Sequence, residues 1–435
     1  MNPALIPTSF RGSSIRVRDA LVAAVVAAAF FAARGLAQTP SQAITVGETF
    51  VIPSAVMRED RRAMISLPES YGRTSSGYPV LFLLDGSSHI VHGAALVQYL
   101  VTARNRIPEM IVVALPNTNR NRDMTPGPGA VQFQEYLAEE LIPWVEQNYR
   151  TVPERVVFGH SLSASFVVHT LLNRPALFSG YIAASAPLWR YDSLARDMRL
   201  GLARAAQAGA AVYLTVGELE TENIRGGVQK VADALRAAPA GQAPASTFSI
   251  LPDEDHNSTP HRSLYNALES RYRSYRLPLF LTSAELDSVG GVDGMQRHYR
   301  LFGERFRYPA LPPPNRVVTV AEILTDAGRF DEVIKLAATY ARDYPRIAEQ
   351  IVNAAGYVQL RRGRLAEGLA TLTQNARMFP DSPNVHDSLG DARCLNEDEK
   401  GALESRQNAV RAAERASHPR LSSYQAKLTM PCAQQ

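Results

Sequence analysis

The sequence predicts an α/β domain with a mostly parallel sheet, followed by an all-helical region. Short, continuously apolar runs alternate with helical patterns up to about residue 306, which is typical of a parallel sheet flanked by helices. Beyond that point strand-like runs stop, and short sequence features recur with a period of about 35 residues. The length of 435 residues suits two or three domains.

The composition excludes several classes of protein. Hydrophobic residues make up 46% of the chain and charged residues 20%, which is the balance of a folded globular protein rather than a disordered one. Two cysteines are too few for a disulfide-dense scaffold or a cysteine-rich zinc module. The net charge of +4 arises largely within residues 1–37. The rest of the chain is therefore nearly neutral and lacks the basic surface of a nucleic-acid-binding protein.

The N-terminus has the layout of a secretory signal peptide. Residues 1–19 carry three arginines and one acid, and residues 20–33 form an almost unbroken apolar run. This run of 14 residues is short for a membrane span of about 20. Gly35 and Ala37 are small residues at the −3 and −1 positions of a cleavage site after Ala37. We therefore expect a signal peptide over 1–37 and a secreted or periplasmic protein; an uncleaved anchor is the alternative.

The predicted elements of the sheet follow in chain order. Residues 44–67 predict a strand or hairpin, because strand-like residues are broken by a charged turn. Residues 131–149 place apolar side chains at four-residue steps, which predicts an amphipathic helix with a kink at Pro143. Residues 162–172 predict another helix. Continuous apolar runs that fit buried parallel strands lie at 80–84, 110–115, 156–158, 181–184 and 211–216.

A proline-rich segment precedes the helical region. Residues 307–317 predict an extended linker because four prolines fall close together. Beyond it, the sequence GRFDE at 328–332 returns as GRLAE at 363–367. Helical pairs at this period resemble tetratricopeptide repeats, here about three repeats over 318–417 with a tail at 418–435; an unrelated helical bundle is the alternative. A repeat surface of this kind suits a protein partner or self-association.

The segment 155–164 (RVVFGHSLSA) carries the strongest chemical signal. It predicts a buried strand, a tight turn and a helix, with Ser161 at the tip of the turn. Such a turn exposes the serine oxygen and directs the next backbone N–H at a developing oxyanion. Gly159 provides the small flanking residue, whereas Ser163 stands where the usual G-x-S-x-G pattern has its second glycine. We expect Ser161 to be a nucleophile; a strand–turn–helix without chemistry is the alternative.

A nucleophilic serine needs a base and an orienting acid, which in this arrangement follow it in the order acid, then histidine. Glu218 and Glu220 follow the predicted strand at 211–216, and His256 follows the apolar run at 247–251. Each candidate therefore lies just past the carboxyl end of a predicted strand, where open α/β sheets place their sites.

The other histidines are weaker candidates for the base. His160 is adjacent to the serine, His169 falls within the following helix, and His261 lies five residues past the preferred histidine. His89 and His92 have the spacing of a metal-binding pair, but no cluster of carboxylates or cysteines accompanies them. We therefore predict no metal site.

Several segments together resemble the esterase D-like branch of the α/β-hydrolases, which includes siderophore esterases, feruloyl esterases and mycolyltransferase antigens. The resemblance covers roughly residues 45–306 and implies an α/β-hydrolase domain over 38–306. It departs from the family pattern at Ser163 and Ala164. The segments that carry it are 78–86 (YPVLFLLDG), 111–118 (IVVALPNT), 122–126 (RDMTP), 159–162 (GHSL), 217–220 (GELE) and 255–258 (DHNS).

The resemblance implies a role for each residue of the site. Ser161 is the nucleophile, and His256 is the general base and acid. The backbone N–H groups of Leu162 and Ser87 are the oxyanion donors, and Gly86 permits the close backbone approach that this donation requires. No metal or organic cofactor is implied.

The acid is the least determined member of the site. The related pattern places its acid third after the glycine, which is Glu220 when counted from Gly217. If extended backbone continues past Val216, Glu218 and Glu220 share one face, and Glu220 lies further above the sheet. We therefore favour Glu220 and keep Glu218 as the alternative acid.

Taken together, these features predict an exported serine hydrolase that cleaves a small-molecule carboxylic ester through an acyl-enzyme. An acyltransferase on the same scaffold and a non-catalytic binding protein acting through its repeats are the alternatives. Siderophore, feruloyl and simple acyl esters all remain open as substrates. Cys394 and Cys432 are the only cysteines, and we hypothesise that they pair in an oxidising compartment, with two free thiols as the alternative.

Overall fold

The computed structural model describes residues 43–103 and 105–432. The signal peptide expected over residues 1–37 lies outside the described residues. Among those that are described, none of the helices combines the length and apolar character needed to cross a bilayer.

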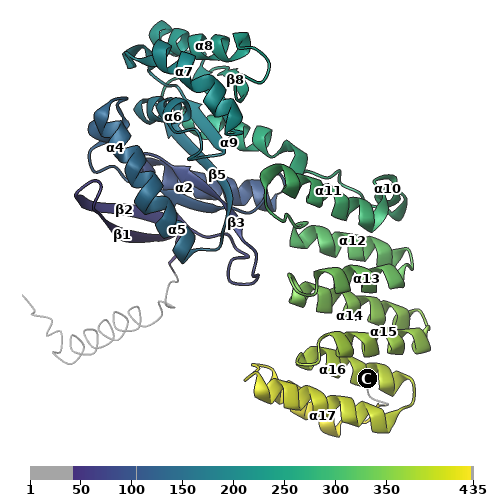
Figure 1. The fold of residues 1–435 in the computed structure, drawn as a ribbon. Helices are drawn as coiled ribbons and strands as arrows, with labels where there is room; N and C mark the ends of the chain where they lie inside the picture. The colour runs from purple at the N-terminus through teal and green to yellow at the C-terminus, as the bar shows by residue number, and fades with distance from the viewer. Residues whose placement is uncertain (1–42, 104, 433–435) are drawn as a thin grey trace, which may run out of the picture. The chain divides into compact units, whose positions relative to one another are not determined.

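Eight strands form one sheet in the order β1-β2-β4-β3-β5-β6-β7-β8 (Figure 1). β1 and β2 form an antiparallel hairpin, and β2 also pairs antiparallel with β4, while all other neighbours are parallel. The carboxyl ends of the parallel strands therefore meet along one edge of the sheet. The strands are β1 (Glu48–Ser54), β2 (Glu59–Ser66), β3 (Tyr78–Leu83), β4 (Ile111–Ala114), β5 (Thr151–His160), β6 (Gly180–Ala184), β7 (Ala211–Gly217) and β8 (Ala245–Leu251).

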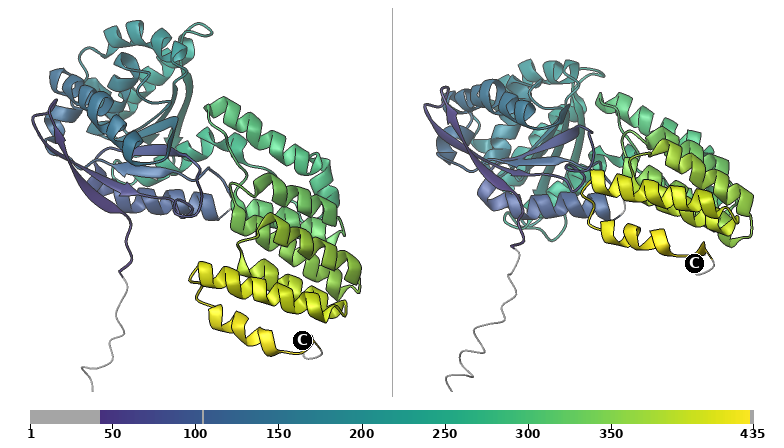
Figure 2. Two further views of the ribbon diagram at one scale, coloured as in Figure 1. Left: turned by 60° about the horizontal axis from the view of Figure 1, so that its bottom comes forward. Right: turned by 90° about the horizontal axis from the view of Figure 1, so that it is seen from below.

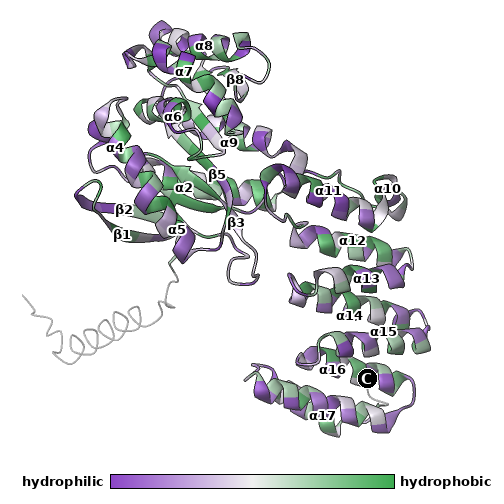
Figure 3. Ribbon diagram, in the orientation of Figure 1, coloured by the Kyte–Doolittle hydropathy of each residue, from purple (hydrophilic) through white to green (hydrophobic). Residues whose placement is uncertain are grey.

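Both faces of the central strands are buried, as continuous apolar runs predict. Val80 and Phe82 of β3 pack into one hydrophobic core with α4 to α8, while Leu81 and Leu83 pack into a second core with α2 and α9. Figure 3 shows the central strands in the colours of hydrophobic residues. The helices are α2 (Gly86–Thr102), α3 (Arg120–Met124), α4 (Pro128–Tyr136), α5 (Ile142–Asn148), α6 (Leu162–Asn173), α7 (Leu194–Gln207), α8 (Glu222–Ala237) and α9 (Thr259–Arg271).

The amphipathic helix predicted over 131–149 is present but contains an irregular turn. α4 runs into a π-helical turn at Leu137–Leu141, and α5 follows directly. Pro143 is the second residue of α5, and its missing N–H leaves the hydrogen-bond ladder of the continuous helix interrupted next to this turn. The wider turn therefore precedes the residue at which the sequence predicts a kink.

Among the residues that the structure describes, helices are the only regular elements beyond β8, so the fold class predicted from the sequence is confirmed. In both views of Figure 2 the green-to-yellow helices lie side by side. After α9 and a short 3-10 turn come α10 (Ser283–Ser288), α11 (Gly291–Phe306), α12 (Pro314–Asp326), α13 (Phe330–Tyr340), α14 (Pro345–Arg361), α15 (Leu365–Met378), α16 (Pro383–Leu395), α17 (Glu399–Arg415) and α18 (Leu421–Ala426).

The period seen in the sequence has a structural counterpart in the turns between these helices. Gly328, Gly363 and Glu397 each have a positive φ, of 76°, 75° and 61°, just before α13, α15 and α17. Glycine adopts this conformation without strain and is the common residue after a helix end. Arg329 and Arg364, which directly follow the two glycines, each form an ion pair with the glutamate three residues on. The helical pairs therefore repeat in backbone geometry as well as in sequence.

The segment predicted as a linker, 307–317, is packed against the structure. α12 begins at Pro314, so the last residues of this segment are helical. The Tyr344 hydroxyl donates to the Pro312 carbonyl at 3.0 Å. Arg316 is buried and donates to two backbone carbonyls of the loop before α10. One hydrophobic core continues from α2 and α9 through α11 to α14, so this junction is a packed joint rather than a free spacer.

Cys394 and Cys432 form a disulfide, with their Cα atoms 5.1 Å apart. The bond ties the chain end to α16. Lys427 adds ion pairs to Asp387 and Asp391 of the same helix. The tail is thus fastened both covalently and electrostatically.

Candidate active site

The turn between β5 and α6 places Ser161 at its tip. Ser161 has φ 58° and ψ −125°, a sparsely populated conformation for a residue other than glycine that costs on the order of 1–3 kcal/mol. Its N–H donates to the carbonyl of Ala184 in β6 at 2.9 Å. A Cβ atom on Gly159 would lie 2.5 Å from the carbonyl oxygen of Ser163. Strand and helix therefore approach so closely that only glycine fits at position 159.

Three residues predicted for the site are brought together by three different strands. His256, in the loop after β8, lies with its Nε2 2.9 Å from Ser161 Oγ. Its Nδ1 lies 2.8 Å from Oε2 of Glu220, in the loop after β7. The Glu220 side chain is fully buried, whereas Glu218 is exposed and accepts the N–H of Asp253 at 3.2 Å. The structure thus places Glu220, and not Glu218, against the histidine.

The charge of Glu220 sets the proton position on His256. Burial raises the pKa of Glu220, but the hydrogen bond from His256 and the interaction with Ser185 lower it more, so the net pKa is below its ordinary value. The carboxylate is therefore ionised at neutral pH, and His256 Nδ1–H donates to it. This tautomer leaves Nε2 free to accept the hydroxyl proton of Ser161.

The histidine loop is held by contacts that the sequence did not indicate. His160 Nε2–H donates to the backbone carbonyl of His256 at 2.6 Å, and the Thr259 hydroxyl donates to the same carbonyl at 3.2 Å. Asp255 accepts the N–H groups of the two residues that follow His256. His160, considered above only as a weaker candidate for the base, therefore supports the loop that carries His256. The two residues are 96 positions apart in sequence, so no local sequence pattern predicts this contact.

The predicted oxyanion donors lie in the first turns of two helices. Ser87 is in the first turn of α2 and Leu162 begins α6, and first-turn N–H groups have no acceptor within their own helix. In the described part of the chain neither N–H has a hydrogen-bond partner. Gly86 donates its N–H to Leu115 at 2.7 Å, and a Cβ on Gly86 would lie 2.4 Å from the Leu115 nitrogen. The close approach expected at Gly86 is therefore made to the backbone after β4.

Further histidines pack beside the site. His89 Nδ1 and His92 Nε2 lie 2.8 Å apart, and the ring centroids of His92 and His261 lie 5.6 Å apart, with the two rings tilted. Across the residues described here, no set of three or more histidine, cysteine, aspartate or glutamate side chains is arranged to hold a metal ion. Burial, aided by the neighbouring histidines, lowers the pKa of both His89 and His160 to about 4. These rings are therefore neutral at physiological pH.

Stability should fall as the pH is lowered from about 6.5 towards 4, because in the unfolded chain both histidines regain an ordinary pKa of 6.5. In that window the unfolded chain binds protons that the folded chain does not, so the free energy of unfolding decreases with decreasing pH. Chemical denaturation at a series of pH values should show this decline, and His89→Gln should make it shallower. If the free energy of unfolding of His89→Gln changed with pH as steeply as that of the unmodified protein, His89 would not have the lowered pKa.

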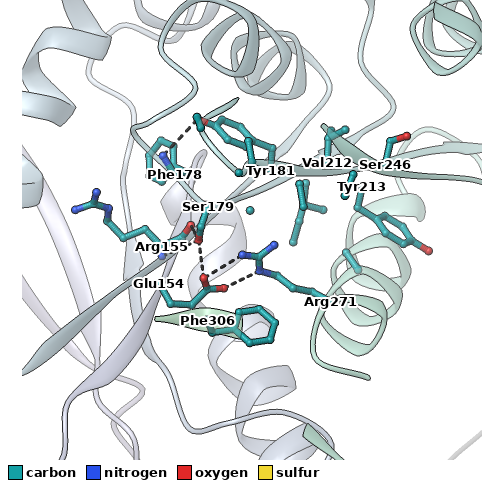
Figure 4. Close-up of a pocket in the computed structure, with 18 of the residues that line it drawn as sticks. Glu154, Arg155, Phe178, Ser179, Tyr181, Val212, Tyr213, Ser246, Arg271 and Phe306 are labelled. Atoms are coloured by element: carbon teal, nitrogen blue, oxygen red, sulfur yellow. Dashed lines mark hydrogen bonds and ion pairs between the residues drawn. The ribbon is translucent and has the colours of Figure 1, made fainter. Parts of the chain in front are cut away.

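A cavity of about 590 Å³ lies at the opposite, amino-terminal edge of strands β5 to β8. Figure 4 shows Glu154 and Arg271 paired there, with Phe306 and Tyr181 nearby. Ser161, Glu220 and His256 do not line this cavity. The candidate active site is therefore identified from the side chains at the carboxyl edge of the sheet, and this cavity is not part of it.

Sequence comparisons relate the chain to known esterases. A family model described as "Putative esterase" matches residues 54–249, a span that includes Ser161 and Glu220 and ends before His256. The ferri-bacillibactin esterase BesA of Bacillus subtilis is 30% identical over 215 residues, which cover 41% of this chain and 73% of that protein.

Solved structures share the fold. An IroE-like serine hydrolase from Shewanella oneidensis aligns with a TM-score of 0.54 at 24% identity, covering 70% of this chain and 98% of that one. An uncharacterised protein from Capnocytophaga ochracea aligns with a TM-score of 0.53 at 14% identity, covering 87% of this chain and 99% of that one; this likeness extends into the helical region. The chain belongs to the "Putative esterase" family of α/β-hydrolases and is an esterase.

Proposed function

We propose that this protein is an exported serine esterase that hydrolyses a carboxylic ester through Ser161, His256 and Glu220. The observation that carries the proposal is the continuous chain of hydrogen bonds from the serine hydroxyl through the imidazole to a buried carboxylate, at 2.9 and 2.8 Å. These distances lie within the range required for proton transfer between a nucleophile and its base. The strained turn at Ser161 adds support, because such strain persists where the surrounding structure holds a functional side chain in place.

The reaction follows from these positions. Ser161 Oγ attacks the acyl carbon while His256 Nε2 takes its proton, and Glu220 stabilises the imidazolium that results. The negative oxygen of the tetrahedral intermediate accepts the N–H groups of Ser87 and Leu162. The intermediate collapses when His256 returns the proton to the departing alcohol, which leaves an acyl-enzyme. Water, deprotonated by His256, then attacks the acyl carbon and releases the carboxylic acid and the free serine.

The name of the Bacillus subtilis relative guides the choice of substrate. That protein is called a ferri-bacillibactin esterase, so we place siderophore esters first in an assay panel. Feruloyl esters and simple acyl esters complete it, because the same triad serves all three classes. Comparing release of acid with transfer to alcohol acceptors separates hydrolysis from acyl transfer.

A fluorophosphonate probe tests the nucleophile directly. We expect stoichiometric labelling of the folded protein, with the adduct found by mass spectrometry on the peptide that contains Ser161. Prior heat denaturation should abolish labelling, because the reaction requires the assembled triad. Labelling at another serine, or none in a protein that hydrolyses esters, would overturn the assignment.

Export and the role of the helical region complete the proposal. A disulfide between Cys394 and Cys432 supports an oxidising compartment and hence cleavage of the N-terminal segment after Ala37, which N-terminal sequencing of the mature protein would test. The recurring turns at Gly328 and Gly363 support tetratricopeptide-like repeats. We assign them a protein partner or self-association, to be tested by light scattering and by cross-linking of the full chain.

A further inference from the structure

The side chain of Asp85 does not cap the helix that it precedes. Asp85 is the residue before α2, a position at which aspartate commonly accepts an N–H of its own helix, yet it makes no such bond. It also adopts φ 52°, which costs free energy in a residue other than glycine. Two residues further on is Ser87, one of the proposed oxyanion donors. The carboxylate is therefore free to bond to other segments, while the backbone of Asp85 forms the turn that leads to the N–H of Ser87.

The Asp85 carboxylate joins its own turn to two other segments at the carboxyl edge of the sheet. It is 8% exposed. Oδ1 accepts from Asn117 Nδ2 at 2.6 Å and from Arg120 Nε at 2.7 Å, both in the segment after β4. Oδ2 accepts from Arg120 Nη2 at 2.9 Å and from Ser163 Oγ at 2.7 Å. Both oxygens of this buried group thus bond to neighbouring segments, the one after β4 and the first turn of α6.

Ser163 connects that carboxylate to the nucleophile turn. Its Oγ accepts the backbone N–H of His160 at 2.9 Å, the residue directly before Ser161. Its hydroxyl hydrogen has two acceptors in range, Asp85 Oδ2 at 2.7 Å and the His160 carbonyl at 2.9 Å. The carboxylate is the nearer and the charged one, so it is the stronger acceptor. Ser163 is the residue at which this sequence departs from the glycine of the G-x-S-x-G pattern, and a glycine there has no side chain to make this link.

We propose that Asp85 and Ser163 form a positioning pair that sets the separation of the two oxyanion donors, the N–H groups of Ser87 and Leu162. The inference rests on the proposed serine-esterase function. An oxyanion is stabilised only by donors held at about 2.7–3.1 Å from its final position, and here the two donors belong to separate elements. The hydrogen bond from Ser163 to Asp85 joins those elements within two residues of each donor.

The charge of Asp85 fits this role because it is neutralised locally. An isolated carboxylate beside an oxyanion site would oppose the negative charge that develops there. Arg120 forms a two-pronged pair with the carboxylate, which cancels most of that field while keeping the strong acceptor for Ser163. Arg120 also approaches the His160 carbonyl at 3.4 Å. The three side chains therefore form one structural unit next to the nucleophile.

Kinetics of two variants test the inference, each with a matched control. Ser163→Ala removes the donor of the link, and Asp85→Asn removes the charge of its acceptor. Ser165→Ala removes a buried hydroxyl of the same helix that has no partner in the described chain, and Asp123→Asn changes another buried carboxylate paired with arginine. We expect kcat for a p-nitrophenyl ester to fall about 10²-fold in the first two variants, as for a misplaced oxyanion donor. KM should stay close to that of the unmodified protein, and the two controls should keep its kcat.

A tetrahedral inhibitor distinguishes positioning from general loosening of the fold. The adduct of an alkyl trifluoromethyl ketone with the serine carries an oxyanion, so its inhibition constant should rise by the same factor as kcat falls. Because the two groups act as one unit, Asp85→Asn/Ser163→Ala should be no slower than the slower single variant. If Ser163→Ala does not fold, Ser163→Gly provides the same test with the residue usual at this position.

Some outcomes would overturn the inference while leaving the serine-esterase function intact. These are unchanged kcat in both link variants, equal losses in the controls, or a raised KM at constant kcat, each with Ser161 still labelled by fluorophosphonate. Failure of the proposed function itself looks different, because hydrolysis would then persist in a variant that lacks the Ser161 hydroxyl.

Discussion

Replacing Ser161 by alanine is expected to reduce kcat for ester hydrolysis by about 10⁶-fold, as removal of the nucleophile does in a serine protease triad. The hydroxyl lies 2.9 Å from His256 Nε2, and no other hydroxyl bonds to that nitrogen among the described residues. The alanine keeps a Cβ at the strained turn, so the fold should be retained. The measurement is the steady-state rate with an activated ester, together with fluorophosphonate labelling.

Ser165→Ala is the matched control for Ser161→Ala, because it removes a hydroxyl from the same segment without touching His256. It should hydrolyse the ester at the rate of the unmodified protein. Substantial hydrolysis by folded, unlabelled Ser161→Ala would mean that another residue is the nucleophile. The rate of the uncatalysed reaction is subtracted, and a small remaining rate does not contradict the prediction, because proteins that lack the triad serine still exceed the rate in water.

Much of the fold follows from local patterns in the sequence. Continuous apolar runs such as 80–84 and 211–216 predict buried parallel strands, and both are strands with buried residues. The glycines at 328 and 363 mark turns that the structure places at equivalent points of successive helical pairs. These features are readable because each depends on residues close together in the chain.

Features that depend on distant contacts could not be read in this way. The prolines of 307–317 predict an extended linker, but Tyr344 and Arg316 pack against this segment and its neighbours. Composition reports local stiffness and says nothing of a core that continues across the junction. The role of Ser163 could not be predicted either, because the sequence shows only that a serine replaces the second glycine of the G-x-S-x-G pattern. Its partner Asp85 lies 78 residues away, so the link became visible only in three dimensions.

The choice between Glu218 and Glu220 depends partly on local sequence and partly on distant contacts. The order of the residues in the chain and the end of β7 at Gly217 restrict the candidates for the acid to the loop after β7. The two glutamates in that loop differ only in their surroundings. The Glu220 side chain has no solvent exposure and faces His256 Nδ1, whereas Glu218 bonds the backbone of Asp253 at the surface. Burial next to the histidine is decided by how the loops after β7 and β8 pack, and no residue pattern encodes that directly.

Glu220→Gln should lower kcat by about four orders of magnitude, the loss seen when the acid of a serine protease triad becomes an amide. The amide NH₂ can donate to Nδ1, which then carries no proton, so the proton moves to Nε2 and the imidazole no longer accepts from Ser161. The amide also fails to stabilise the imidazolium that forms during attack. The effect should appear in the acylation rate measured by stopped flow with an activated ester, while the circular dichroism spectrum stays unchanged.

Glu218→Gln is the matched control, since it makes the same chemical change two residues away in the same loop. Its side chain accepts one backbone N–H at 3.2 Å and is exposed, so its loss should leave the acylation rate close to that of the unmodified protein. A large loss in Glu218→Gln with a normal rate in Glu220→Gln would move the acid by two residues. Normal rates in both variants would reduce the site to a Ser161–His256 dyad. The 2.8 Å contact between His256 Nδ1 and Glu220 argues against both of these results, because the imidazole N–H is the main group that stabilises the ionised form of this buried carboxylate.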